Sequence, residues 1–161
     1  MTESALPGPS PMTPEETLAA VPQQKPFRFL DEIVELDEKH IVGRYRFTED
    51  EFFYPGHFPG DPVTPGVILT EAMAQTGVVA LGLFLTSLKV SRDQLSQWTT
   101  FFSECQVEFL RPVLPGETVT IEGETVYFRR MKLKSQVRLY LANGELAAEG
   151  TLAGVGVKRD E

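Results

Sequence analysis

The sequence predicts an α+β fold in which one antiparallel sheet curls around one long helix. Two observations carry this prediction: an almost purely apolar stretch of helical length at 65–86, and strand-like segments on both sides of it. A chain of 161 residues without internal repeats has the size of one domain and is long enough to bury a sizeable core.

The stretch 65–86 predicts a helix of roughly 33 Å at the usual rise per residue. Thr64 is a suitable N-cap, and Pro65 is a suitable first helical residue. Because this helix is apolar on nearly every side, other structure should wrap it. Gly77 and Gly82 weaken it intrinsically, so we expect another element to approach its backbone closely.

Strand-like patterns occur in six segments, two before the helix and four after it: 29–36, 40–47, 99–109, 118–128, 132–141 and 145–157. A short polar link predicts that the first two form a hairpin. Asn143-Gly144 is a strong hairpin signal between the last two.

The segment 99–109 has the clearest period of two. Ser103, Cys105 and Val107 alternate with polar neighbours, which predicts a half-buried strand. A lone cysteine in such a pattern is most often a small core residue, so Cys105 is expected to be buried.

Residues 1–13 are expected to form a flexible Pro-rich tail, because their composition cannot bury enough apolar area to offset the entropy of ordering. The single domain then covers 14–161. Thr13 as N-cap and Pro14 as first helical residue predict a short helix that ends before Pro22.

The composition excludes several classes of function. A formal net charge of -8 argues against a nucleic-acid-binding surface. One cysteine, two separated histidines and the lack of a glycine-rich nucleotide loop predict no disulfide, no metal site and no cofactor. The longest apolar run, 78–85, is shorter than the roughly 20 residues of a membrane span. Residues 1–14 lack the features of a signal peptide, which predicts a cytoplasmic protein.

The loop 56–66 (GHFPGDPVTPG) presents a candidate catalytic imidazole. Its glycines and prolines hold unusual backbone angles around His57. A lone histidine is most often a structural hydrogen-bonding residue, but this rigid setting favours catalysis. The other histidine, His40, follows Lys39 at a strand start and is expected on the solvated surface.

Glu71 is the one ionisable residue of the apolar helix. A carboxylate there is costly unless it is paired or protonated, and burial raises its pKa, which suits a general acid. Helical spacing places Gln75 on the same face as Glu71. Gln75 therefore either orients an active group or forms a hydrogen bond within a subunit contact.

Gly66 is the third candidate, because its N–H lies in the first helical turn, where backbone donors lack partners and the helix dipole favours negative charge. It could hold a carbonyl oxygen that gains charge, or it could simply form a tight turn. A base, an acid and an oxyanion donor together describe proton abstraction beside a carbonyl, with protonation of a leaving group.

Residues 57–75 (HFPGDPVTPGVILTEAMAQ) closely resemble the signature of the (3R)-hydroxyacyl-acyl carrier protein dehydratases of bacterial fatty acid synthesis. The resemblance continues in 109–117 (FLRPVLPGE), at Arg129-Arg130 and in the Asn143-Gly144 hairpin. Only the first dozen residues fall outside it.

This resemblance implies a hot-dog fold, in which a curved antiparallel sheet wraps a long helix, and homodimers that often assemble as trimers of dimers. The family's active histidine falls on His57, its active carboxylate on Glu71 across the dimer interface, and its helix-start amide on Gly66. The implied enzyme is a hydro-lyase that converts (3R)-hydroxyacyl thioesters on acyl carrier protein to trans-2-enoyl thioesters, in fatty acid, polyketide or polyene synthesis.

Two other functions remain open at this stage. A hot-dog acyl thioesterase or acyl-CoA hydratase would share the fold, and a non-catalytic protein could bind acyl carriers without reacting. The pair of His57 and Glu71 favours the lyase.

Four cations are expected at the turn between the fourth and fifth strands: Arg129, Arg130, Lys132 and Lys134. They are candidates for docking an acidic carrier protein. A solvated hairpin explains them equally well.

Overall fold

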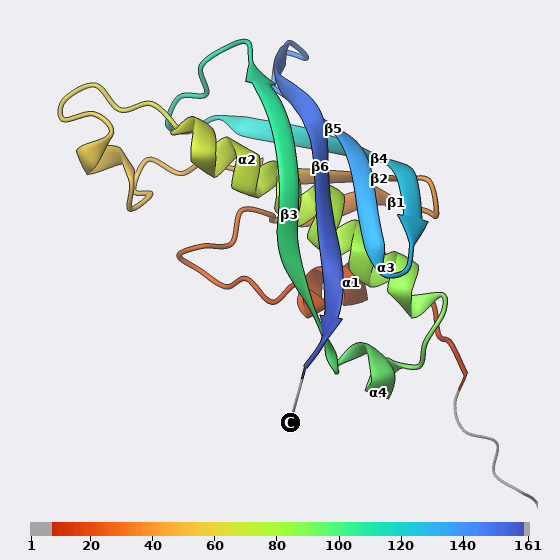
Figure 1. Ribbon diagram of the computed structural model, residues 1–161. Helices are drawn as coiled ribbons and strands as arrows, with labels where there is room; N and C mark the ends of the chain where they lie inside the picture. The colour runs from red at the N-terminus through yellow and green to blue at the C-terminus, as the bar shows by residue number, and fades with distance from the viewer. Residues whose placement is uncertain (1–7, 160–161) are drawn as a thin grey trace, which may run out of the picture.

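The computed structural model describes residues 8–159. A six-stranded sheet in the order β1-β2-β4-β5-β6-β3 wraps one long helix, and each neighbouring pair of strands is antiparallel (Figure 1). The strands are β1 (Glu32–Leu36), β2 (His40–Arg46), β3 (Trp98–Phe109), β4 (Thr118–Arg129), β5 (Lys132–Tyr140) and β6 (Leu146–Lys158). The predicted fold class is confirmed.

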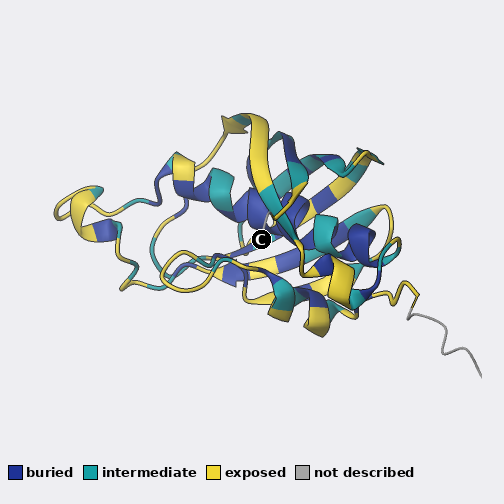
Figure 2. Ribbon diagram, turned by 60° about the horizontal axis from the view of Figure 1, so that its bottom comes forward, coloured by how far each residue is buried: buried dark blue, intermediate teal, exposed yellow. Residues whose placement is uncertain are grey.

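The central helix runs from Gly66 to Ser87. It consists of α2 (Gly66–Ala74), a π-helical turn (Gln75–Ala80) and α3 (Leu81–Ser87). Although it is long and apolar enough to cross a membrane, 72% of its most apolar window is buried inside the protein. Figure 2 shows this buried helix enclosed by the rest of the chain, which is the arrangement of a core helix.

The π-helical turn is where the sheet comes closest to the helix. A Cβ added at Gly77 would lie 2.5 Å from Cγ2 of Val137 on β5, so only glycine fits there. The hydroxyl of Ser135 on β5 donates to the carbonyl of Gly77 at 2.6 Å, which gives a backbone acceptor in the widened turn a partner. The expected close approach is confirmed at Gly77. At Gly82 an added Cβ would meet only ordinary contact, 3.7 Å from Leu133.

The start of the central helix differs from the prediction. Pro65, not Thr64, occupies the N-cap position, and no side chain caps the helix. The hydroxyl of Thr64 is instead hydrogen-bonded to the hydroxyl of Tyr54 at 2.7 Å. Its N–H donates to the carbonyl of Val113 at 2.9 Å. Thr64 therefore anchors the preceding loop, and its side chain is not free to cap.

The expected burial of β3 is wrong. This strand forms one edge of the sheet and pairs only with β6. Most of its residues are exposed, and Cys105 is exposed as well. Alternation in a sequence predicts two different faces, but a face is buried only where a second layer covers it.

The segment before β1 agrees with the prediction at α1 and differs from it in the residues just before that helix. The short helix α1 (Pro14–Ala20) forms with the expected Thr13 cap, which makes a capping box with Glu16. Of the predicted tail, residues 1–7 lie outside the described part of the chain. Met12, however, is buried, and its N–H donates to the hydroxyl of Ser87 at 3.2 Å, so the residues next to α1 are packed.

Two further differences concern element boundaries. β1 begins at Glu32 rather than at residue 29, because the N–H of Phe29 donates to the side chain of Gln75 at 2.7 Å and not to a strand. The short helix α4 (Arg92–Leu95) was not among the predicted elements. Its capping box, Ser91 with Gln94, was visible in the sequence as Ser-x-x-Gln.

Candidate active site

His57 lies on a loop that projects from the fold at the N-terminal end of α2 (Figure 1). A single 3-10 turn (Tyr54–Gly56) precedes it, and the N–H of His57 donates to the carbonyl of Tyr54 at 3.2 Å. Phe58 and Asp61 exchange two backbone hydrogen bonds, at 3.1 and 2.9 Å, which close a tight turn after the histidine. Backbone hydrogen bonds thus hold the loop in shape.

The ring of His57 has a defined tautomer. Its Nδ1 lies 2.8 Å from the carbonyl oxygen of Val63. A carbonyl can only accept, so Nδ1 carries the proton and the neutral ring keeps an unshared electron pair on Nε2. Among the described residues, no hydrogen bond engages Nε2. The imidazole is therefore arranged to take a proton at Nε2.

Gln75, one turn further along the central helix, holds the side chain of Glu71. The side-chain amide of Gln75 donates to Oε1 of Glu71 at 3.1 Å and to the carbonyl of Phe27 at 2.9 Å. Its oxygen accepts the N–H of Phe29 at 2.7 Å. Gln75 is fully buried, so it joins the carboxyl to the backbone of the 27–29 segment. Of the two alternatives for Gln75, these contacts support the orienting one.

Burial raises the pKa of Glu71 above its ordinary value, and the hydrogen bond from Gln75 partly opposes this rise. A carboxyl in this setting keeps its proton to higher pH than an exposed glutamate does. The pKa of Glu71 is therefore shifted in the direction that a general acid requires.

Gly66 is the first residue of α2, so its N–H is one of the backbone donors at the helix N-terminus that have no partner within the helix. A Cβ added there would lie 3.1 Å from the ring of Phe109 on β3. The two residues line an open groove together with Leu69 and Arg111. A glycine at this position lets the ring of Phe109 pack close to the start of the helix.

Within one protomer the structure does not bring His57 and Glu71 into contact. No hydrogen bond or ion pair joins them among residues 8–159. The loop that carries His57 projects from the domain (Figure 1). The carboxyl of Glu71 is instead hydrogen-bonded to Gln75 of the central helix. One protomer thus holds the imidazole of His57 and the carboxyl of Glu71 apart from each other.

The surroundings of the site expose apolar side chains on several elements. Val67 on α2 is 76% exposed, and the large apolar residues Phe58, Phe109, Leu110 and Leu114 are exposed as well. The edge strand β3 lies beside Gly66, which the ring of its residue Phe109 contacts. Exposed apolar surface together with an unpaired strand edge is typical of an interface.

The four cations at the β4–β5 turn lie at the other end of the molecule, beside α3 (Figure 1). Lys132 and Lys134 lie 3.9 and 3.6 Å from Glu104 on β3. Arg129 stacks over the ring of Tyr127, and Arg130 turns the chain with a positive φ of 50°. The two lysines are thus engaged within the domain.

His40 lies at the start of β2 on the partly exposed surface, as expected. Its two ring nitrogens contact the carboxylates of Glu35 and Asp37 at 3.0 and 2.8 Å, and the hydrogen bonds to them raise its pKa. It forms no part of the candidate site.

The backbone partners of the site could not be predicted from the sequence. The carbonyl of Val63 sets the tautomer of His57, and the 27–29 backbone holds Gln75. Neither contact has a sequence signal, because main-chain groups are the same in every residue. The approach of Phe109 to Gly66 was likewise not visible.

Comparison with known proteins gives a consistent family. The family model of the FabA-like domain matches residues 21–154. A 3-hydroxyacyl-(acyl-carrier-protein) dehydratase FabZ from Desulforamulus reducens is 41% identical over 133 residues, which cover 82% of this chain and 88% of that protein. The protein of the same name from Thermus thermophilus is 38% identical over 150 residues, covering 87% and 94%.

Solved structures share the fold at low identity. The dehydratase heterocomplex ApeI:P from Xenorhabdus doucetiae matches with a TM-score of 0.68 at 14% identity, over 93% of each chain. A thioesterase from Haemophilus influenzae matches with a TM-score of 0.67 at 17% identity, over 96% of each chain. These likenesses show the hot-dog fold, which proteins of different activity share.

Proposed function

The chain belongs to the FabA-like family, and from this membership we propose that it dehydrates 3-hydroxyacyl thioesters carried on acyl carrier protein. Relatives 37–41% identical over most of the chain are named for this activity. One observation at the site carries the proposal. An imidazole with a free electron pair on Nε2 occurs with a partly buried carboxyl whose pKa is raised, and these are the base and the acid that the reaction needs.

The reaction transfers two protons, one at each end of the carbon–carbon bond that becomes the double bond. Nε2 of His57 takes the proton from the carbon beside the thioester carbonyl. Glu71 gives its proton to the hydroxyl on the next carbon, which leaves as water as the carbon–carbon double bond forms. The N–H of Gly66 stabilises the charge that develops on the thioester oxygen. Proton exchange with water then restores both groups.

We place the two reacting groups in one site by pairing two copies of the chain. Contact between β3 edges around a two-fold axis would cover the exposed apolar residues and bring His57 of one subunit to Glu71 of the other. The unpaired positions of both groups within one protomer support this arrangement. Trimers of such dimers, the (3R) configuration of the substrate and a cytoplasmic location belong to the same proposal.

Product analysis tests the chemistry. The purified protein should convert 3-hydroxyacyl-acyl carrier protein to the 2-enoyl thioester with loss of one water, followed by mass spectrometry of the intact acyl carrier. Release of a free carrier thiol with an unchanged 3-hydroxy acid would identify a thioesterase instead. The same assay on coenzyme A thioesters measures the preference for the carrier.

Mixed dimers test the shared site. His57→Ala and Glu71→Gln chains are each inactive alone, but a mixed dimer has one site with both changes and one with neither. Random assortment makes about half of the dimers mixed, so refolding the two variants together should restore roughly a quarter of the wild-type activity. With subunit exchange confirmed by mass spectrometry, a mixture that stays inactive would show that both groups act within one chain.

A further inference from the structure

A second cavity lies at the far end of the central helix from His57. It has a volume of about 330 Å³, which is within the range of small-molecule sites. Its walls are largely apolar and come from the helix, the α1 region, α4 and the start of β3. The residues that matter here are Val79, Leu83, Trp98, Pro22, Met12 and Arg92. We call this space the distal cavity.

Two elements connect the distal cavity to the candidate acid. Along the helix, Gln75, Val79 and Leu83 follow one another at intervals of four residues; the first holds Glu71, and the other two line the cavity. The segment after α1 runs alongside, since Phe27 contacts Gln75 and Pro22 lines the cavity. At the usual rise per residue, Glu71 is about 12 Å from Val79 and about 18 Å from Leu83 along the axis.

This separation matches the reach of an acyl chain rather than of a compact ligand. A thioester whose 3-hydroxyl meets Glu71 extends its alkyl tail away from the carbonyl. Only a tail of medium or greater length reaches Val79 and Leu83, and the apolar wall there favours burial of methylene groups.

The N-terminal strap, residues 10–12, closes one side of the distal cavity. Arg92 on α4 holds it with three donors. Its Nε reaches the carbonyl of Ser10 at 3.0 Å, and its Nη2 reaches that of Pro11 at 3.2 Å. Its Nη1 pairs with Glu16 of α1 at 2.7 Å.

Met12 is the strap residue that lines the cavity, and only 8% of it is exposed. Its backbone is fixed by the hydrogen bond from its N–H to Ser87 at the end of α3. Methionine is long and unbranched, so it fills an irregular space without closing it completely. The side chain of Met12 is therefore a part of the cavity wall that a tail would meet.

Resting on the proposed function, we infer that Met12, held in place by Arg92, sets the longest acyl chain that the enzyme accepts. Met12 and Arg92 are specificity-determining residues in this inference and take no part in the proton transfers. A smaller side chain at position 12 should let the enzyme accept longer tails, and a larger one should restrict it to shorter tails. Release of the strap should also let longer tails in.

The first test is a chain-length profile. We would measure kcat/KM for 3-hydroxybutyryl, 3-hydroxyoctanoyl, 3-hydroxydodecanoyl and 3-hydroxyhexadecanoyl thioesters of acyl carrier protein. Met12→Ala should raise the hexadecanoyl-to-octanoyl ratio about tenfold, the gain from burying roughly two more methylenes. Met12→Phe should lower the same ratio, and butyryl turnover should stay within about twofold of wild type because that chain ends before the cavity.

Arg92→Gln provides a second route if Met12→Ala does not fold, since it releases the strap and leaves Met12 intact. It should raise the hexadecanoyl-to-octanoyl ratio in the same direction. Two control variants should keep the wild-type ratio. Val21→Ala changes a buried residue at the end of α1 that does not line the cavity. Arg44→Gln removes an ion pair on β2. An unchanged ratio in folded Met12→Ala and Arg92→Gln proteins would overturn the inference.

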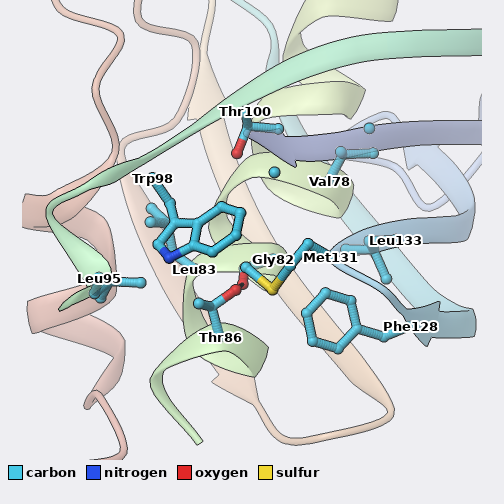
Figure 3. A pocket seen from close by; sticks show the side chains of 12 residues that line it. Val78, Gly82, Leu83, Thr86, Leu95, Trp98, Thr100, Phe128, Met131 and Leu133 are labelled. Carbon is cyan, nitrogen blue, oxygen red and sulfur yellow. Dashed lines mark hydrogen bonds between the residues drawn. The ribbon is translucent and has the colours of Figure 1, made fainter. Parts of the chain in front are cut away.

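The second test does not depend on turnover. Trp98 is the single tryptophan of the chain, and it lines both the distal cavity and a smaller neighbouring pocket. Figure 3 shows its indole beside Leu83 and Leu95. In Glu71→Gln protein, which retains the substrate unreacted, dodecanoyl and hexadecanoyl thioesters should shift the Trp98 emission, and the butyryl thioester should not.

The two tests separate the inference from the proposed function. A wild-type protein inactive on every thioester would defeat the proposed dehydration, while the Trp98 titration would still decide whether tails enter the cavity. Activity on short chains with a Trp98 emission that is the same at every chain length would defeat the inference alone.

Discussion

The two ends of the central helix differ in how far the chain encloses them. At the C-terminal end, α1 and α4 pack against α3, and Leu81 is fully buried. At the N-terminal end, Val67 is 76% exposed, and Glu71 is only partly covered beside an open groove. One continuous helix therefore has a closed end and an open end.

The closed end of the helix mainly serves the stability of the fold, and the open end carries the candidate catalytic groups. Burial of apolar area stabilises the folded state, so the closed end contributes more than the open end to the free energy of unfolding. A catalytic carboxyl needs access to substrate and an environment that raises its pKa, and the open end provides both. Substitutions at the two ends should therefore affect different measurements.

The largest effect is expected at the open end, on turnover. His57→Ala and Glu71→Gln should each lower kcat by about 10² to 10⁴, the usual contribution of one general acid or base. Glu71→Gln keeps the shape of the side chain, so its thermal stability should remain close to that of wild type. Steady-state dehydration and thermal denaturation measure the two quantities, and turnover within threefold of wild type in either variant would contradict the assigned roles.

The next effect is expected at the closed end, on stability. Leu81→Ala should lower the free energy of unfolding by about 2–5 kcal/mol, because it leaves a cavity among buried side chains. In a separate protomer, Val67→Ala at the open end should change it by less than about 0.5 kcal/mol, because Val67 is exposed there. Urea titration of both variants checks this. A loss at Val67 comparable to that at Leu81 would show that another surface covers the open end in solution.

A smaller effect follows from the raised pKa of Glu71. Because burial makes the folded state hold this proton more tightly than the unfolded state does, the free energy of unfolding should fall as pH rises from the ordinary value of 4.5 through the raised value. Glu71→Gln removes the titrating group and should flatten this part of the profile. Unfolding titrations across that pH range, with Glu122→Gln on the exposed face of β4 as control, measure the difference.

The smallest effect is expected for carrier docking at the β4–β5 turn. Arg129→Glu with Arg130→Glu should weaken the activity on acyl carrier protein several-fold at low salt. The gap from wild type should narrow as salt rises, because such charges are screened over about 8–10 Å. Reaction with the matching coenzyme A thioester is the control. Unchanged activity on the carrier would mean that this hairpin is a solvated turn and that the carrier docks elsewhere.

Much of the fold could be predicted because its signals are local. The apolar helix at 65–86 and the Thr13 N-cap depend on neighbouring residues alone, and both form nearly as expected. Predictions that assumed a surrounding layer did less well. Cys105 lies in a clear alternation but is exposed, because β3 is an edge strand with no layer over it in the protomer. Met12 is buried although its segment is rich in proline.

Residue types and their local spacing were enough to select the candidate groups of this protein: the imidazole of His57 in a rigid loop and the carboxyl of Glu71 on an apolar helix. The tautomer of His57, set by the carbonyl of Val63, and the fixing of Gln75 by the 27–29 backbone became visible only in the folded chain. The same holds for Met12, which lines the distal cavity and whose N–H contacts the Ser87 hydroxyl 75 positions away. Main-chain partners and long-range contacts depend on where the folded chain passes, and no local pattern of residue types records that.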